Sequence, residues 1–108
     1  MNNDDRVVDL RTYRLRPGGG ETFDRIFRED VLPLLTAFEI DVASHGTSRD
    51  DADSYYLVRT FASTAERNSR LDAFYGSDEW RERHRDRVLE LIDSYHVLLL
   101  EARDLALR

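Results

Sequence analysis

The sequence predicts an α+β fold, in which one antiparallel sheet packs against helices on a single face. Four stretches have the alternation, the β-branched content or the apolar run that is typical of strands. Two further regions carry apolar residues at the i, i+3, i+4 spacing of amphipathic helices. These elements follow one another as β-α-β-β-α-β, which is the ferredoxin-like arrangement.

The first predicted strand spans residues 7–15 and alternates between two faces. One face carries Val8, Leu10 and Thr12, and the other carries Asp9, Arg11 and Tyr13. Pro17 and the glycines at 18–20 end this strand. The glycines lack the spacing of a phosphate-binding loop, and the acidic residues Glu21 and Asp24 that follow would repel phosphate. We therefore interpret the glycines as a turn into a helix.

The first predicted helix runs through residues 21–38. Its apolar face consists of Phe23, Ile26, Phe27, Val31, Leu34, Leu35 and Phe38. Pro33 lies within this pattern and lacks a backbone N–H, so we expect it to kink the helix or to end its regular part. Residues 40–47 and 55–61 are then predicted as two strands of a hairpin, and the polar segment 48–54 as its turn.

The second helical region is predicted in two pieces. Ser63 and Glu66 have the spacing of a capping box, in which the two side chains satisfy exposed backbone N–H groups at the helix start. Gly76 favours a helix end, and Ser77 favours a new start. One face of the second piece carries Trp80, His84, Val88 and Leu91.

The apolar run at residues 95–102 is predicted as the last strand, and residues 103–108 as a short tail or a segment that contacts a partner. In the ferredoxin-like topology the first and third strands are central, and helices cover one face of the sheet. The other face would be bare in a monomer, and the apolar residues on the strands argue against its exposure. We therefore expect a homodimer in which two sheets pair.

The composition excludes several classes of function. The 108 residues are predicted to form a single domain, and their formal net charge of −6 argues against nucleic acid and anionic membranes as partners. The absence of cysteine excludes disulfides and thiolate chemistry. No apolar run is long enough to span a bilayer, and the polar start MNNDDR is unlike a signal peptide. We therefore expect a cytoplasmic protein.

Several motifs of the chain resemble the NIPSNAP family. They are DLRTYRLRPG from Asp9, VLPLL from Val31, YLVRTF from Tyr56, STAERNSRLDAF from Ser63 and SDEW from Ser77. The resemblance covers residues 6 to 102 and implies a dimeric α+β barrel, a homodimer whose two sheets face each other with the helices outside. That superfamily includes cofactor-free monooxygenases, haem-degrading enzymes, isomerases and stress-response proteins without a known reaction. The resemblance therefore implies a fold and an assembly, and it implies no settled activity.

Seven residues are candidates for lining a binding pocket. They are Arg11, Tyr13, His45, Tyr56, Arg59, Trp80 and His84. The histidines are not at metal-ligand spacing, so we expect no bound metal and no tightly held haem, although His84 is the best placed to serve as a haem ligand. By alternation, His45 lies on the strand face opposite Val42 and Ser44, either in a cavity or in the dimer interface.

Arg11 and Arg59 lie on the two strands that are predicted to be central, where an unpaired charge is costly. Asp9 shares a strand face with Arg11 and is its nearest carboxylate by sequence. If carboxylates satisfy both arginines, the cluster is structural. If they do not, Arg11 and Arg59 hold the acceptor group of an anionic or carbonyl-bearing ligand, which Tyr13 orients.

Three functions remain open on the sequence. The first is a NIPSNAP-like dimeric barrel that binds a small organic molecule between sheet and helices. The second is a cofactor-independent monooxygenase or isomerase that acts on an aromatic or polyketide-like compound, and the third is a non-enzymatic dimeric interaction protein. A concave cavity with convergent polar groups favours the first two, and a filled core with an exposed patch favours the third.

Overall fold

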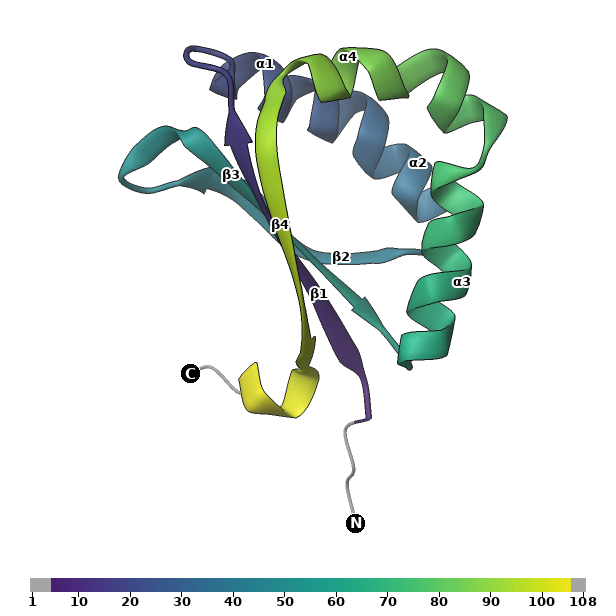
Figure 1. The fold of residues 1–108 in the computed structure, drawn as a ribbon. Helices are drawn as coiled ribbons and strands as arrows, with labels where there is room; N and C mark the ends of the chain where they lie inside the picture. The colour runs from purple at the N-terminus through teal and green to yellow at the C-terminus, as the bar shows by residue number, and fades with distance from the viewer. Residues whose placement is uncertain (1–4, 106–108) are drawn as a thin grey trace.

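The computed structural model describes residues 5–105, which form a four-stranded antiparallel sheet with helices on one face (Figure 1). The strands are β1 (Val7–Leu15), β2 (Asp41–Ser48), β3 (Asp51–Phe61) and β4 (Ile92–Glu101). Their order across the sheet is β2-β3-β1-β4, so the first and third strands are central, as predicted. The predicted α+β, ferredoxin-like class is therefore confirmed.

The helical segments follow β1, β3 and β4. They are α1 (Gly20–Ile26), η1 (Phe27–Val31), α2 (Leu32–Ala37), α3 (Thr64–Tyr75), η2 (Trp80–His84), α4 (Arg85–Glu90) and η3 (Ala102–Leu105). In Figure 1 the segments from α1 to α4 form a layer over one face of the sheet. Residues 106–108 of the predicted tail lie outside the described residues.

Pro33 neither ends the first helical region nor breaks it. The backbone N–H of Leu32 bonds to the carbonyl oxygen of Phe27, five residues earlier, so η1 is a widened π-type turn. Pro33 follows directly in the first turn of α2, where its missing N–H costs least. The proline is therefore accommodated by a change of helical pitch just before it.

The predicted hairpin turn is too long, because β3 already begins at Asp51. The Asp51 carboxylate accepts hydrogen bonds from the Ser54 hydroxyl at 2.8 Å and from the backbone N–H of Asp53 at 3.0 Å, and it pairs with Arg14 on the neighbouring β1. These bonds satisfy polar side chains within the strand. The polar residues that suggested a loop therefore form the end of a longer hairpin, which projects beyond the helices.

The start of α3 has the predicted cap. The Ser63 hydroxyl accepts a hydrogen bond from the N–H of Glu66 at 3.1 Å, and the Glu66 carboxylate reaches back to the N–H of Ala62 at 2.6 Å. Gly76 ends α3, as predicted, and the Ser77 hydroxyl accepts a hydrogen bond from the N–H of Trp80 at 3.2 Å. These caps set the turn that carries the chain from α3 to η2.

The glycine segment is a turn, as the sequence indicated. Gly18 has a φ of +81°, and its N–H donates to the Asp53 carboxylate at 3.1 Å. A Cβ on Gly20 would lie 2.4 Å from the carbonyl oxygen of Ala52, so only glycine fits against the hairpin there. The backbone N–H of Gly18 therefore bonds to a carboxylate of the same chain and stabilises the fold.

The two faces of the sheet differ in how they are covered. The buried core between sheet and helices includes Phe23, Phe27, Leu35, Tyr55, Leu57, Phe74, Trp80 and Val88. On the opposite face, Leu10 and Val58 are partly exposed and Leu98 is 57% exposed. Within residues 5–105, no helix has the length and apolar character needed to cross a membrane.

Candidate functional site

A cavity of about 370 Å³ lies between the β1–β4 side of the sheet and the segments α3, η2 and α4. It is lined by Arg11, Tyr13, Tyr75, Trp80, Arg85, Leu89, Ile92 and Tyr95. Leu89 and Tyr95 are exposed, so the cavity opens to solvent beside them. Its volume lies within the roughly 300–1,000 Å³ of small-molecule sites in proteins.

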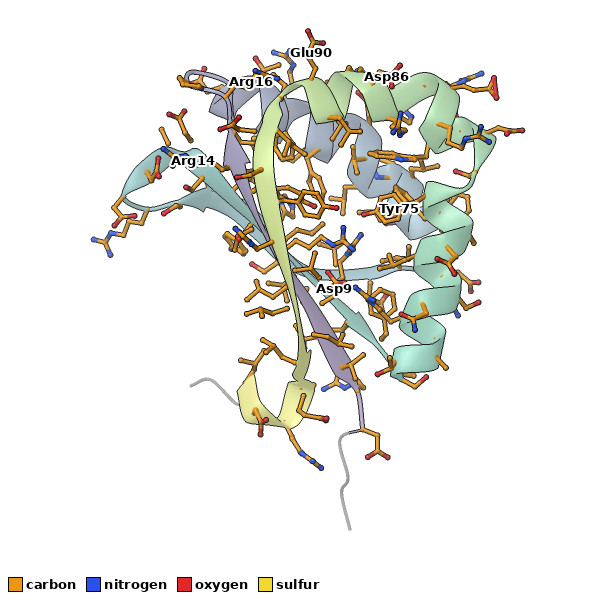
Figure 2. The ribbon with its side chains drawn as sticks, in the orientation of Figure 1. Asp9, Arg14, Arg16, Tyr75, Asp86 and Glu90 are labelled. Carbon is orange, nitrogen blue, oxygen red and sulfur yellow. The ribbon has the colours of Figure 1, made fainter. Side chains whose placement is uncertain are left out.

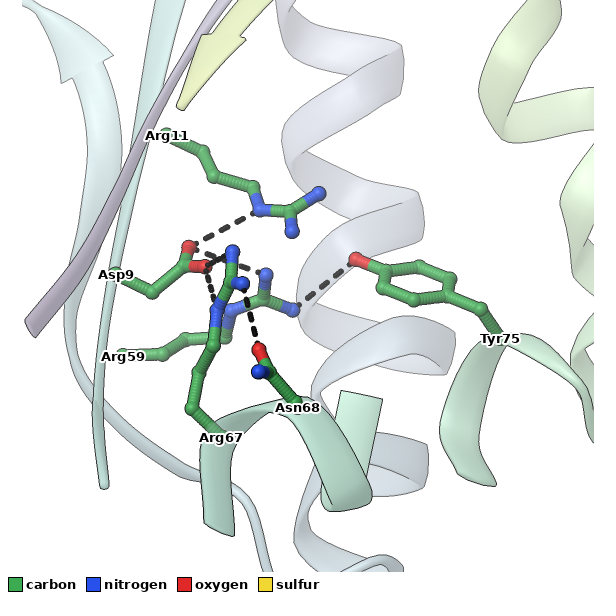
Figure 3. A network of polar contacts seen from close by, with 6 residues as sticks. All are labelled: Asp9, Arg11, Arg59, Arg67, Asn68 and Tyr75. Atoms are coloured by element: carbon green, nitrogen blue, oxygen red, sulfur yellow. Dashed lines mark hydrogen bonds and ion pairs between the residues drawn. The ribbon is translucent and has the colours of Figure 1, made fainter. Parts of the chain in front are cut away.

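The polar floor of this region is organised by Asp9, whose side chain is fully buried. One carboxylate oxygen, Oδ1, accepts from Arg11 Nε at 3.0 Å and from Arg59 Nη2 at 3.2 Å. The other oxygen, Oδ2, accepts from Arg67 Nε at 3.0 Å and from Arg67 Nη2 at 2.7 Å (Figure 3). Burial alone would raise the pKa of Asp9, but these three guanidinium groups outweigh it and hold that pKa below its usual range.

The cluster carries more positive charge than its carboxylate can balance. Three guanidinium groups surround the single carboxylate of Asp9, which leaves two positive charges in excess. Arg59 is buried to 1% exposure, and its Nε has no hydrogen-bond partner among the described residues. Such an excess at the edge of a cavity attracts an anion or a polarised oxygen.

Arg11 belongs both to this cluster and to the cavity. It is bound to Asp9 through Nε only, and no side chain within residues 5–105 accepts a hydrogen bond from its terminal Nη groups. Its guanidinium carbon lies 5.5 Å from the centre of the Tyr75 ring, a cation–π distance. Burial lowers the pKa of Arg11, but Tyr75 and Asp9 raise it by more, so the side chain stays charged where it faces the cavity.

Arg59 lies behind the cavity wall and does not line the cavity. Its Nη1 donates to the hydroxyl oxygen of Tyr75 at 3.1 Å, so it contacts the cavity through Tyr75. Figure 2 shows Asp9 and Tyr75 in the space between the sheet and α3. The sequence left two alternatives open for these arginines, pairing within the chain and ligand binding. Arg59 is bound by groups of this chain, whereas Arg11 has donors that face the cavity.

Tyr13 and Trp80 were predicted as pocket residues, and both line the cavity. Tyr13 packs against Phe23 with ring centres 5.5 Å apart, and burial is the main cause that raises its pKa above the ordinary value. Trp80 stands edge-on to Tyr75 at 5.6 Å. Together with Leu89 and Ile92, the indole ring supplies an apolar wall opposite the charged floor.

His45 and Tyr56 lie away from the cavity. A β-bulge between Val42 and Ser44 shifts the alternation of β2. His45 therefore lies opposite Ser44, as the alternation predicts, but it shares the helix-facing side with Val42, contrary to the prediction. His45 Nδ1 lies 2.9 Å from the Tyr55 hydroxyl. Tyr56 points to the opposite, open face of the sheet, where its hydroxyl lies 2.7 Å from Ser44 Oγ.

His84 is also outside the cavity lining. Its Nδ1 lies 2.8 Å from Arg87 Nη2, and the same nitrogen of Arg87 contacts Asp30 at 2.8 Å. His84 therefore takes part, through Arg87, in a link between α4 and η1. Within residues 5–105, no group of three or more His, Asp or Glu side chains is placed to hold a metal ion.

The sequence reasoning missed two residues of the site on α3, Arg67 and Tyr75. Both face the sheet, because they lie two helical turns apart on the side that also carries the buried Leu71. The 67, 71, 75 spacing was the available signal. It could have placed a cation and a hydroxyl opposite the charged residues of β1.

The fold and the cavity together define a class, that of ferredoxin-like α+β proteins with a pocket between sheet and helices. Several of the solved structures that this chain resembles are NIPSNAP proteins. A NIPSNAP family protein from Agrobacterium tumefaciens superimposes with a TM-score of 0.87 at 18% identity, covering 98% of this chain and 93% of that one. An uncharacterised NIPSNAP-like domain protein from Burkholderia xenovorans gives 0.83 at 17%, covering 91% and 85%. The likeness drawn from the motifs is thus confirmed at the level of the fold.

A candidate monooxygenase from Lactobacillus acidophilus has the same fold, with a TM-score of 0.71 at 15% identity. The match covers 91% of this chain and 45% of that protein, so this chain spans less than half of its length. No family model matches the sequence, and no curated protein matches it.

Proposed function

We propose that this protein is a NIPSNAP-like homodimer that binds a small organic molecule, with an acidic or carbonyl oxygen, in the cavity between sheet and helices. The observation that carries the proposal is the state of Arg11. Its terminal nitrogens face the cavity, while the Asp9 carboxylate that it contacts is shared among three guanidinium groups. A ligand oxygen supplies the acceptor that these donors lack.

The remaining walls indicate the body of the ligand. Trp80, Leu89 and Ile92 offer apolar and aromatic surface, and Tyr13 and Tyr95 offer rings with a polar end. The lining combines these apolar groups with the guanidinium groups of Arg11 and Arg85, a combination typical of sites for amphiphilic molecules. The cavity therefore suits an aromatic or short aliphatic body that carries one acidic or carbonyl group.

The dimer is the second component of the proposal. The face of the sheet opposite the layer from α1 to α4 carries Leu10, Val58 and the exposed Leu98. Pairing two such faces would remove this apolar surface from water, and a stable interface of this kind buries more than about 1,200 Å² in total. The ligand cavity lies on the other side of the sheet, so dimerisation leaves it accessible.

A cofactor-independent monooxygenase or isomerase is an alternative that the same cavity supports. The likeness to the candidate monooxygenase favours it, and so do the hydroxyl groups of Tyr13 and Tyr75 beside a guanidinium. A non-enzymatic interaction protein is the other alternative. It would be favoured if the cavity accepted no ligand.

A thermal-shift panel of small carboxylates and phenols tests the proposal. A bound ligand worth about 1 kcal/mol should raise the Tm of a domain of this size by about 4–8 °C. We expect such a rise for the wild type, its loss in Arg11→Met, and its retention in Arg14→Met, a matched control on the same strand whose side chain lies at the exposed hairpin. No shift with any member of the panel would contradict ligand binding.

A further inference from the structure

The hydroxyl group of Tyr75 has a hydrogen atom to donate. Its oxygen accepts a hydrogen bond from Arg59 Nη1 at 3.1 Å, and no described residue accepts a hydrogen bond from it. A phenolic hydroxyl can accept and donate at the same time. Because Tyr75 lines the cavity, its donor is available to a ligand there.

Arg59 holds this hydroxyl in place. The guanidinium is anchored on Asp9 at 3.2 Å and is buried, so it has little freedom to move. A hydrogen bond from a cation makes the hydroxyl a stronger donor on its other side, because hydrogen bonds in a chain polarise one another. The ring of Tyr75 is also fixed, by edge contacts with Phe74 and Trp80.

Arg11 presents its donors to the same point. Its guanidinium carbon lies 5.5 Å from the centre of the Tyr75 ring, and in Figure 3 its terminal nitrogens point toward the Tyr75 hydroxyl. Two donors from different elements, β1 and α3, thus converge beside the apolar wall of Trp80. Convergent donors in a partly dry site stabilise an oxygen that carries or develops negative charge.

We infer that Arg11 and Tyr75 form a two-point site for a single oxyanion of an organic ligand, and that Arg59 is a positioning residue that acts through Tyr75. The inference rests on the proposed function, and it narrows the ligand to one whose charge lies on oxygen: a carboxylate, a phenolate or an enolate. It also assigns the orienting hydroxyl to Tyr75, in place of Tyr13. Tyr13 packs against Phe23 and forms part of the wall.

Benzoate is a suitable probe, with benzamide as a neutral control of nearly the same shape. Trp80 is the single tryptophan of the chain and lines the cavity, so its fluorescence reports binding there directly. We expect wild type to bind benzoate in preference to benzamide. We expect Tyr75→Phe, which keeps the ring over Arg11, to bind benzoate about tenfold more weakly, as loss of a hydrogen bond to a charged group predicts.

Tyr56→Phe is the matched control, because it removes the same hydroxyl from a tyrosine on the open face of the sheet, away from the cavity. We expect it to bind benzoate as the wild type does. Tyr13→Phe tests the competing assignment, and a loss there with none in Tyr75→Phe would overturn the two-point site. Equal losses in Tyr75→Phe and Tyr56→Phe would overturn it as well.

The role of Arg59 is tested by a double-mutant cycle of Arg59→Met with Tyr75→Phe. If Arg59 acts through Tyr75, Arg59→Met weakens benzoate binding in the wild type and adds little once Tyr75 is phenylalanine. Two results would overturn the inference and leave the proposed function standing. One is full additivity of the two substitutions. The other is unchanged benzoate binding by Tyr75→Phe while Arg11→Met still loses binding. No binding of benzoate or of any panel member by the wild type would overturn both the inference and the proposed function.

Discussion

Asp9 is the residue on which the charged cluster depends. It is fully buried and is the shared partner of Arg11, Arg59 and Arg67. Its removal leaves a buried guanidinium without its counter-charge, which is far more costly than losing an exposed ion pair. The cluster therefore stabilises the fold at the same time as it points Arg11 toward the cavity.

Asp9→Asn should lower the free energy of unfolding by about 3–5 kcal/mol, because Arg59 would stay buried without a carboxylate. Urea denaturation measures this directly. Asp93→Asn, a matched change at an exposed position of β4, should stay within about 0.5 kcal/mol of the wild type. Similar small losses in both variants would show that the cluster contributes little to stability.

The stability contributed by Asp9 should depend on pH in a defined direction. The pKa of Asp9 is lowered in the folded state, against about 3.9 in an unfolded chain. The contribution is therefore fully present above about pH 4 and is lost as the pH falls through the lower, folded pKa. Denaturation of wild type and Asp9→Asn over a pH series should show their difference shrinking below about pH 4. A difference that stays constant would contradict the assignment.

The sequence predicted some of the contacts within the candidate site. The pairing of Asp9 with Arg11 followed from two residues on one strand face, and it is observed. Arg67 and Tyr75 come from a distant helix, and their approach depends on how α3 packs across the sheet, which no local pattern specifies. The sequence left open which sheet face His45 occupies, and its predicted separation from Val42 is wrong because a β-bulge adds a residue without a clear sequence signal.

The helix α3 positions Arg67 and Tyr75 in the site, so the contribution of its N-terminal cap to stability can be tested by mutation. Ser63→Ala removes the cap hydrogen bond to the N–H of Glu66 and should cost about 1 kcal/mol. Ser69→Ala makes the same substitution at an exposed position within the helix, where alanine has the better helix propensity and no loss is expected. Chemical denaturation of both variants gives the comparison, and an equal effect would argue against the cap.

The elements differ in how well local rules predicted them. The boundaries of β1 and the cap and end of α3 follow from alternation, a capping box and a glycine, and they are observed as predicted. The hairpin and the first helix were less accurate. In the hairpin, polar side chains are paired through tertiary contacts, as Asp51 is with Arg14. In the first helix, a π-type turn accommodates Pro33.

The whole molecule presents two exposed leucines on opposite faces of β4. Leu98 pairs with Leu10 and points to the open face of the sheet, whereas Leu99 pairs with Asp9 and points to the helix side. Their exposures are 57% and 41%. This arrangement separates the face proposed for the dimer from the face that carries the cavity.

Sedimentation at micromolar concentration should show a particle of about twice the 12.7 kDa chain mass. Leu98→Glu places a charge in the paired sheets and should yield monomers, while Leu99→Glu, one residue away, should remain dimeric. A wild-type particle with the mass of one chain would contradict the proposed dimer. Dissociation of both variants would show that the interface is not confined to the open face.

We expect Arg11 to bind the oxyanion of a ligand inside the cavity. The most direct measurement is a crystal structure of the protein with benzoate at saturating concentration. We expect the carboxylate at hydrogen-bond distance from the terminal nitrogens of Arg11 and from the Tyr75 hydroxyl, with the ring against Trp80. A cavity that stays free of benzoate while the anion binds elsewhere, or a ring bound there with its carboxylate turned away from Arg11, would contradict the account.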